Sequence, residues 1–132
     1  MRIPRKVTGF INKYVKVLGL SRYKLRVALI SDNLYMVDNK VVETEYLGEI
    51  VCEGNNYYVL ILTEKALRED IEDTIIHELL HLFFWVFVER MKNIVDIMDI
   101  HIEKKTRLED EIDDLEHAWI DKLAPIIRKY PL

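Results

Sequence analysis

Three residues of this chain have the types and the spacing needed for metal-assisted hydrolysis. His77 and His81 are four positions apart, so on a helix their imidazole rings lie on one face and can share a metal ion. Glu78 lies about 100° further around such a helix, where its carboxylate can reach a water on the shared metal. A catalytic zinc binds imidazole nitrogen and keeps one position open for water. The sequence therefore points to hydrolysis by a metal-activated water, with Glu78 as the general base.

The same spacing also fits a helix in which the two histidines are merely satisfied hydrogen-bond partners. The surrounding run, residues 75–88, weighs against this alternative because it is almost entirely apolar. Burying His and Glu in such a run is costly unless they are paired or bind a metal. We therefore expect Zn2+ as the cofactor.

The motif must be positioned by a long helix, which the sequence predicts to begin at Asp70 or Asp73 as the N-cap. Apolar residues surround the motif on nearly every side, so we expect the helix to be buried on several sides and to be the central element of the domain. Lys92-Asn93 is typical of a helix C-terminus. Residues 94–102 have no clean period, and they either continue the helix or form a separate packed segment.

A last helix is predicted over residues 107–129, entered from a solvated, charged loop that starts at Lys104. The expected apolar stripe of this helix consists of Leu108, Ile112, Leu115, Trp119, Leu123 and Ile126. Glu116 falls on the stripe, where a carboxylate needs a partner, and a metal held by the two histidines would supply one. His117 points about 100° further round, as an alternative ligand or an outer hydrogen-bonding group. A Glu116 that reaches solvent or pairs with a lysine also fits the pattern.

The rest of the chain predicts a further helix and a small sheet. A helix is expected over residues 4–19, ending at Gly19, and strands are expected over residues 23–30, 34–37, 41–53 and 57–62. The predicted fold class is α+β, with an N-terminal helix, a small, mostly antiparallel sheet, the central HExxH helix and a C-terminal helix that carries Glu116. At 132 residues the chain is expected to form one domain, residues 1–132.

Composition excludes several classes of function. The net charge of -4 gives no electrostatic footprint for nucleic acid. No signal peptide is visible, and the apolar run 75–88 is too short to cross a bilayer, so we expect no membrane association. The single cysteine, Cys52, fits a reducing compartment, and the expected location is the cytoplasm.

Two segments resemble the small zincin-type metallopeptidases whose third zinc ligand is glutamate, the minimal gluzincins found in phages and prophages. Residues 73–81, DTIIHELLH, are similar to the family's HExxH helix with its preceding threonine and apolar pair. Residues 116–124, EHAWIDKLA, are similar to its downstream glutamate helix. The order of the expected elements extends the resemblance over most of the chain, although the long connection 92–106 and the His that follows Glu116 depart from the pattern.

The resemblance implies a zinc peptidase in which His77, His81 and Glu116 are the ligands and Glu78 is the general base. The substrate would be a peptide or protein, bound by edge pairing to the strand before the motif helix. The candidates for stabilising the oxyanion are tyrosines without a fixed geometry: Tyr35, Tyr46, Tyr57 and Tyr58. Two alternatives stay open, namely a non-catalytic zincin-fold module that acts through a protein partner, and a metal-free protein with a chance motif.

Overall fold

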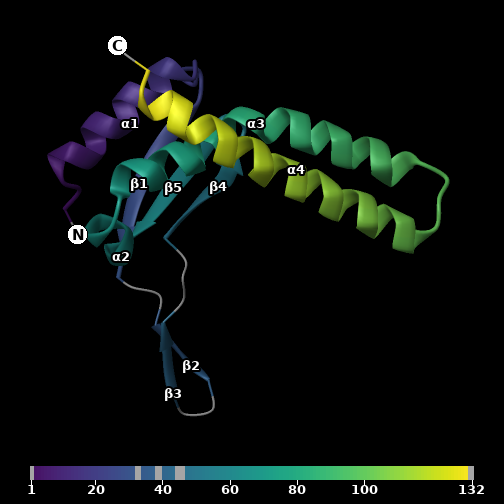
Figure 1. Cartoon of the computed structure of the whole chain (residues 1–132), viewed down its shortest axis with the longest axis horizontal. Coiled ribbons are helices and arrows are strands. Elements are labelled where there is room, and N and C mark those ends of the chain that lie inside the picture. Colours follow the sequence, from purple (N-terminus) through teal and green to yellow (C-terminus); the bar gives the residue numbers. More distant parts are fainter. Residues whose placement is uncertain (1, 32–33, 38–39, 44–46, 131–132) are drawn as a thin grey trace.

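The computed structural model describes residues 2–31, 34–37, 40–43 and 47–130, and it confirms the predicted α+β class (Figure 1). Its elements in chain order are α1 (Arg5–Val17), β1 (Lys24–Ile30), β2 (Leu34–Val37), β3 (Lys40–Glu43), β4 (Gly48–Gly54), β5 (Tyr57–Thr63), α2 (Glu64–Arg68), α3 (Ile71–Ile97) and α4 (Ile102–Arg128). Among these residues, no helix is long and apolar enough to cross a membrane.

The three-stranded sheet has the order β1-β5-β4 and is mixed, whereas the sequence predicted a mostly antiparallel one. β1 runs parallel to β5, because the chain between them is long enough to return to the same end of the sheet. β4 is antiparallel to β5 and joined to it by the predicted turn, in which Asn56 takes a positive φ of 61°. The strand expected over residues 41–53 is divided between β3, which pairs with β2 in a separate antiparallel ribbon, and β4.

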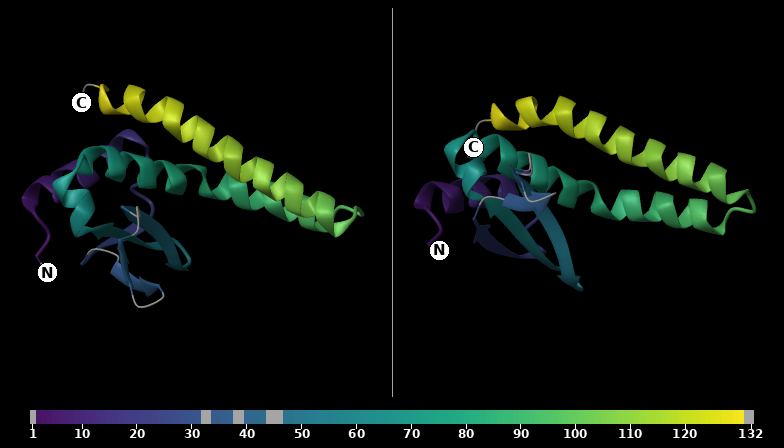
Figure 2. Two further views of the ribbon diagram at one scale, coloured as in Figure 1. Left: turned by 60° about the horizontal axis from the view of Figure 1, so that its bottom comes forward. Right: turned by 90° about the horizontal axis from the view of Figure 1, so that it is seen from below.

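α1 and the first part of α3 lie against the sheet and enclose the core (Figure 2). α1 ends as the sequence predicted: Gly19 has φ 68°, and the following residue, Leu20, donates its N–H to the Val15 carbonyl at 2.8 Å. Leu20 is buried, so the helix end also contributes an apolar contact. The core therefore fixes where α3 starts and which of its faces is covered.

α3 is buried over its first half only, which corrects the expectation of a helix surrounded on several sides. Its buried residues run from Ile71 to Leu82, and Val95 follows near the end. Past its buried first half the helix extends beyond the sheet (Figure 2), and Phe87, near the end of the predicted apolar run 75–88, is 70% exposed. The helix continues through residues 94–97, which settles the first part of the 94–102 segment as helical.

α4 begins at Ile102, so the charged segment predicted as a loop is helical. Its Lys, Arg and Glu residues have high helix propensity, and no glycine or proline interrupts them. α4 returns antiparallel to α3, and the two form a long hairpin that projects from the core in both views of Figure 2. Lys92 of α3 pairs with Asp113 of α4 at 2.8 Å, and Lys105 donates to the Asp96 carbonyl at 2.7 Å.

The predicted apolar stripe of α4 is only partly buried. Of its residues only Ile112 is buried, and the other buried positions of α4, Ile120 and Ala124, lie outside the predicted stripe. Leu115 and Trp119, which the spacing placed on the stripe, are more than half exposed. The reason is that α4 packs against α3 through the side of the helix that carries Glu116, and not through the centre of the predicted stripe. No other described element covers the side that carries Leu115.

Candidate metal centre

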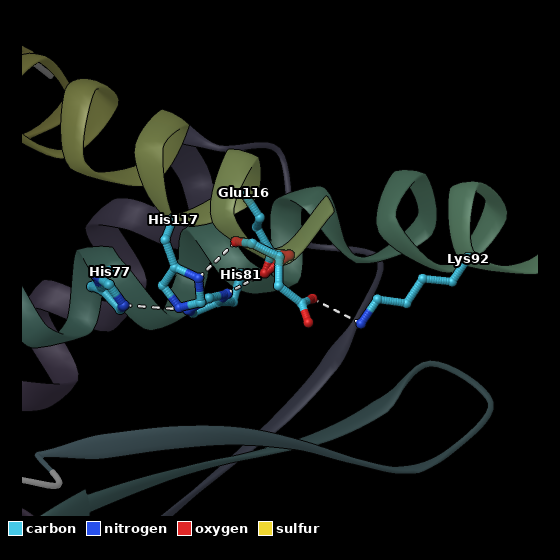
Figure 3. A network of polar contacts seen from close by, with 6 residues as sticks. His77, His81, Lys92, Glu116 and His117 are labelled. Atoms are coloured by element: carbon cyan, nitrogen blue, oxygen red, sulfur yellow. Dashed lines mark hydrogen bonds and ion pairs between the residues drawn. The ribbon is translucent and has the colours of Figure 1, made fainter. Parts of the chain in front are cut away.

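α3 presents His77 and His81 on one face, with their Nε2 atoms 3.2 Å apart (Figure 3). The helix that holds them begins at Asp70, whose side chain accepts a hydrogen bond from the Asp73 N–H at 3.2 Å, as the sequence predicted. In a tetrahedral site with ordinary zinc–nitrogen distances, two ligand nitrogens lie about 3.3 Å apart. The two rings therefore stand at the separation that a shared metal ion requires.

His117 of α4 brings a third imidazole to this pair. One ring nitrogen each from His77, His81 and His117 lie within 4.8 Å of one another, so these residues could hold a metal ion. The Nδ1 of His117 is 2.9 Å from the Asp113 carbonyl oxygen, which can only accept, so Nδ1 carries the proton. The Nε2 of this ring is then left with a lone pair for a ligand. His117 is exposed, and it is the ring with the most freedom to close the remaining distance.

Glu116 lies in the site but contacts the outer nitrogen of a histidine. Its Oε1 is 2.6 Å from Nδ1 of His81, and both side chains are mostly buried. Because an ionised carboxylate only accepts hydrogen bonds, Nδ1 of His81 is the donor and Nε2 keeps its lone pair toward His77. A carboxylate in this position fixes the ring and its tautomer, as outer hydrogen-bond partners of metal-binding histidines commonly do.

The third ligand expected from the sequence was Glu116, with His117 as the alternative. The geometry groups His117 with the two histidines of the motif, and it places Glu116 behind His81. The ligand role of Glu116 stays a prediction, whereas its contact with His81 is a feature of the fold. The residues of the metal centre thus come from two helices that only the hairpin brings together.

Glu78 is a buried carboxylate with an unsatisfied oxygen. It is 6% exposed, and its Oε2 has no hydrogen-bond partner among the described residues. Burial, followed by the charges of Glu49 and Glu116, raises the pKa of Glu78 to about 8. A buried polar atom left without a partner needs an explanation, and a functional role is one of the few available.

His77 is shifted toward its neutral form. Burial lowers the pKa of the His77 imidazole, and the neighbouring His81 and His117 add to the effect. A metal binds the neutral ring, so a histidine that resists protonation is ready to act as a ligand.

A cleft of about 440 Å³ opens beside Glu78 and His81. Its walls come from β4, α3 and α4, and they consist of Glu49, Ile50, Glu78, His81, Trp85, Val88, Glu89, Lys92, Asp113 and Glu116. β4 can approach α3 closely because residue 48 is glycine: a Cβ there would lie 3.1 Å from Thr74 Cγ2 and 3.4 Å from Glu78 Cγ. An outer strand of the sheet is therefore held against the motif helix at the general-base candidate.

The tyrosines considered as oxyanion stabilisers do not enter this cleft within the described structure. Tyr58 is buried and packs edge-on against Tyr23 and Trp85. Tyr57 is half exposed and contacts Lys24 at the far end of β5. Tyr46 and the side chain of Tyr35 lie outside the described part of the chain.

Sequence reasoning overlooked two contributors to the cleft, Lys92 and Asp113. The sequence placed Lys92 at a helix C-terminus and Asp113 on the solvated face of the last helix, yet their ion pair lies along the cleft wall, and the Asp113 carbonyl contacts the His117 ring. Asp113 lies four residues before His117, so a backbone contact between the two was implied once that segment was known to be helical.

Comparison of the chain with protein-family models, with curated proteins and with solved structures found no match in any of the three. The zincin resemblance thus has no support from a relative, and the function must be inferred from the geometry of the centre itself.

Proposed function

We propose that this protein is a zinc-dependent peptidase of the zincin type, with His77, His81 and His117 as the metal ligands and Glu78 as the general base. The observation that carries the proposal is the approach of two imidazole Nε2 atoms to 3.2 Å beside a buried, unpartnered carboxylate in an open cleft. Each feature alone occurs in ordinary helices, but together they match the needs of metal-assisted hydrolysis.

The donor set fits zinc. Three imidazoles with an open fourth position are a known zinc arrangement, and borderline-soft zinc accepts nitrogen readily. Glu116 and the Asp113 carbonyl each hold the outer nitrogen of one ring, so the Nε2 lone pairs of His81 and His117 are directed inward. Zinc, when bound, would supply a Lewis acid for the scissile carbonyl and would make a water more acidic.

The protein's own residues would transfer the proton and leave room for the substrate. Glu78 takes the proton of the attacking water and delivers it to the nitrogen of the leaving amine. Glu78 is one of the residues that line the cleft, which is open to solvent on one side, so a water and a peptide can both approach its side chain. Glu116 keeps the ring of His81 in place throughout.

An extended peptide would pair with β4. The sequence suggested the strand before the motif helix, which is β5, but that strand is central and both its edges are occupied by β1 and β4. β4 is an outer strand, and its residues Glu49 and Ile50 line the cleft. Main-chain pairing along the edge of β4 that faces away from β5 would place a peptide bond beside Glu78.

The proposal is tested by metal content and by the Glu78→Gln variant. Protein purified without chelators or a metal-affinity tag is expected to contain an equimolar amount of zinc by elemental analysis and to cleave members of a mixed peptide library. Glu78→Gln should keep the zinc and lose cleavage, while the exposed cleft residue Glu89, changed to Gln, should retain both. Full cleavage by Glu78→Gln would exclude the assigned role. Zinc binding by a wild-type protein that cleaves nothing would favour a non-catalytic binding module instead.

A further inference from the structure

The projecting part of the α3–α4 hairpin carries an apolar face that no described residue covers. Its residues are Phe83, Phe87, Met91 and Ile94 of α3, Met98 directly after α3, and Leu115 and Trp119 of α4, and we call this set the hairpin face. The α3 members follow one another by three or four positions, which places them in one row along the helix. Phe87 and Ile94, at 70% and 58% exposed, are among its most open positions.

The hairpin face is hollowed between the two helices. A groove of about 290 Å³ runs there, and its walls include Phe87 and Met91 from α3 and Leu115 and Trp119 from α4. An apolar groove with apolar shoulders is the shape into which the side chains of another helix pack.

The hairpin face and the proposed catalytic cleft lie on adjoining sides of the hairpin. Val88 and Glu116 line both the cleft and the groove, but the cleft also includes Trp85, Glu89 and Lys92 of α3, whereas the groove includes Phe87 and Met91. At 100° per residue these two sets point in different directions from the helix axis. A molecule bound to the hairpin face would therefore reach the border of the cleft at Val88 and Glu116 without covering the side of α3 that carries Trp85 and Glu89.

We propose that the hairpin face binds a second copy of this chain, so that two hairpins form a four-helix bundle. A stable interface of standard size takes about 800 Å² from each partner, and the hairpin face offers seven large apolar residues, each 40–70% exposed. This is more apolar surface than a monomer usually leaves in one patch. Two antiparallel helices cover each other on one side only, and the common solution is to pack a second pair against them.

The charges at the borders of the hairpin face suit pairing with itself. Arg90 lies on the border of the α3 row that is turned away from α4, and Glu111 lies on the opposite border, along α4; both are exposed. When each α3 packs over the α4 of the other copy, Arg90 lies near Glu111 of the partner subunit, and the two-fold symmetry forms this pair twice. A lone partner helix or a lipid surface offers no such matching pair.

Sedimentation velocity between about 1 and 100 µM tests the proposal on the full chain. The wild type is expected to sediment as a dimer, and Phe87→Glu and Ile94→Glu are expected to raise the dissociation constant at least tenfold. Tyr57→Glu is the matched control, because Tyr57 is half exposed on β5 and away from the hairpin, and it should stay dimeric. Arg90→Glu should weaken the dimer, and adding Glu111→Arg should restore it.

Several outcomes would overturn the proposal. These are a wild type that is monomeric over the whole range, variants at Phe87 and Ile94 that dimerise normally, and a monomer that instead binds anionic phospholipid vesicles through Phe87. Zinc content and circular dichroism measured on the same samples separate this test from that of the peptidase. Loss of the dimer should leave both unchanged, and an inactive protein can still dimerise.

Discussion

At the scale of single residues, the metal centre depends on which nitrogen of each histidine is occupied. His81 gives Nδ1 to Glu116 and His117 gives Nδ1 to the Asp113 carbonyl, which leaves the Nε2 atom of each ring for a metal. Glu116, which the sequence placed near the two histidines, does lie in this candidate site. Glu116 contacts the outer nitrogen of His81, while a ring nitrogen of the adjacent His117 lies within 4.8 Å of ring nitrogens of His77 and His81.

This arrangement predicts different losses of zinc affinity at neighbouring positions. Glu116→Gln should lower the affinity by roughly 10–100-fold, as is typical when an outer hydrogen-bond partner of a ligand histidine is changed. His117→Ala removes a ligand and should lower it further. His101→Ala is the control, because His101 caps α4 at the far end of the hairpin. Competition with a chromogenic chelator measures all three, and a larger loss in Glu116→Gln than in His117→Ala would reassign the third ligand to Glu116.

Glu78 also makes the stability of the metal-free protein dependent on pH. Its pKa is raised from 4.5 to about 8, so between these values the folded state binds a proton that the unfolded state releases. The free energy of unfolding therefore falls as the pH rises through this window. Full ionisation of a carboxyl with such a shift costs several kcal/mol, because each pKa unit corresponds to about 1.4 kcal/mol.

Urea denaturation in the presence of EDTA at pH 5 and pH 8 measures this effect. The wild type should lose about 3 kcal/mol more than Glu78→Gln between the two pH values, since the amide cannot ionise. Glu89→Gln, which changes an exposed carboxyl of the same cleft, should behave as the wild type does. Equal pH dependence in the wild type and in Glu78→Gln would show that Glu78 ionises normally in the folded protein.

At the scale of elements, the close contact between β4 and α3 makes the cleft. Gly48 permits it, because a Cβ at this position would lie 3.1 Å from both the Ile61 carbonyl oxygen and Thr74 Cγ2. Contacts this short force the strand and the helix apart. The edge of β4 would then move away from Glu78, and with it the proposed binding edge for the peptide.

Substitutions of two glycines by alanine should therefore have opposite effects on stability. Gly48→Ala is expected to lower the free energy of unfolding by about 1–3 kcal/mol through this overpacking. Gly9→Ala, in the middle of α1, should raise it by about 0.5–1 kcal/mol, because a Cβ there meets nothing within 4 Å and alanine favours the helix. Chemical denaturation of both variants checks the signs, and a neutral Gly48→Ala would mean that β4 and α3 are less tightly packed than described.

Most helix boundaries followed from local sequence, whereas burial along the helices did not. The N-cap at Asp70 and the glycine stop at Gly19 are set by residues in direct sequence contact with the helix ends. The exposure of Phe87 and Trp119 depends instead on how far the sheet and α1 extend beside the hairpin. An apolar pattern identifies a face that needs covering, but it does not say whether the covering comes from the same chain.

At the scale of the whole molecule, the α3–α4 hairpin contributes to two surfaces, the cleft and the hairpin face. Its base joins the sheet and forms the cleft with the metal centre, and its projecting part presents the hairpin face (Figure 1). The two surfaces adjoin at Val88 and Glu116 but face different directions from α3, so the cleft would keep its own opening in the proposed dimer. The dimer would also give the projecting half of α3, whose side chains are mostly exposed, the apolar contacts that the sheet gives to the first half.

The sequence by itself determined the identity of His77, Glu78 and His81 as a possible metal site, because four residues of helix fix the relation between them without any other part of the chain. It also determined the α+β class, since the periodicities that mark helices and strands are local. The tertiary structure decided that His117 joins the two histidines, that Glu116 holds His81 from behind, and that β4 rather than β5 borders the cleft. These relations depend on the rotation of α4 against α3 and on the order of strands, which arise from packing between segments that are distant in the sequence.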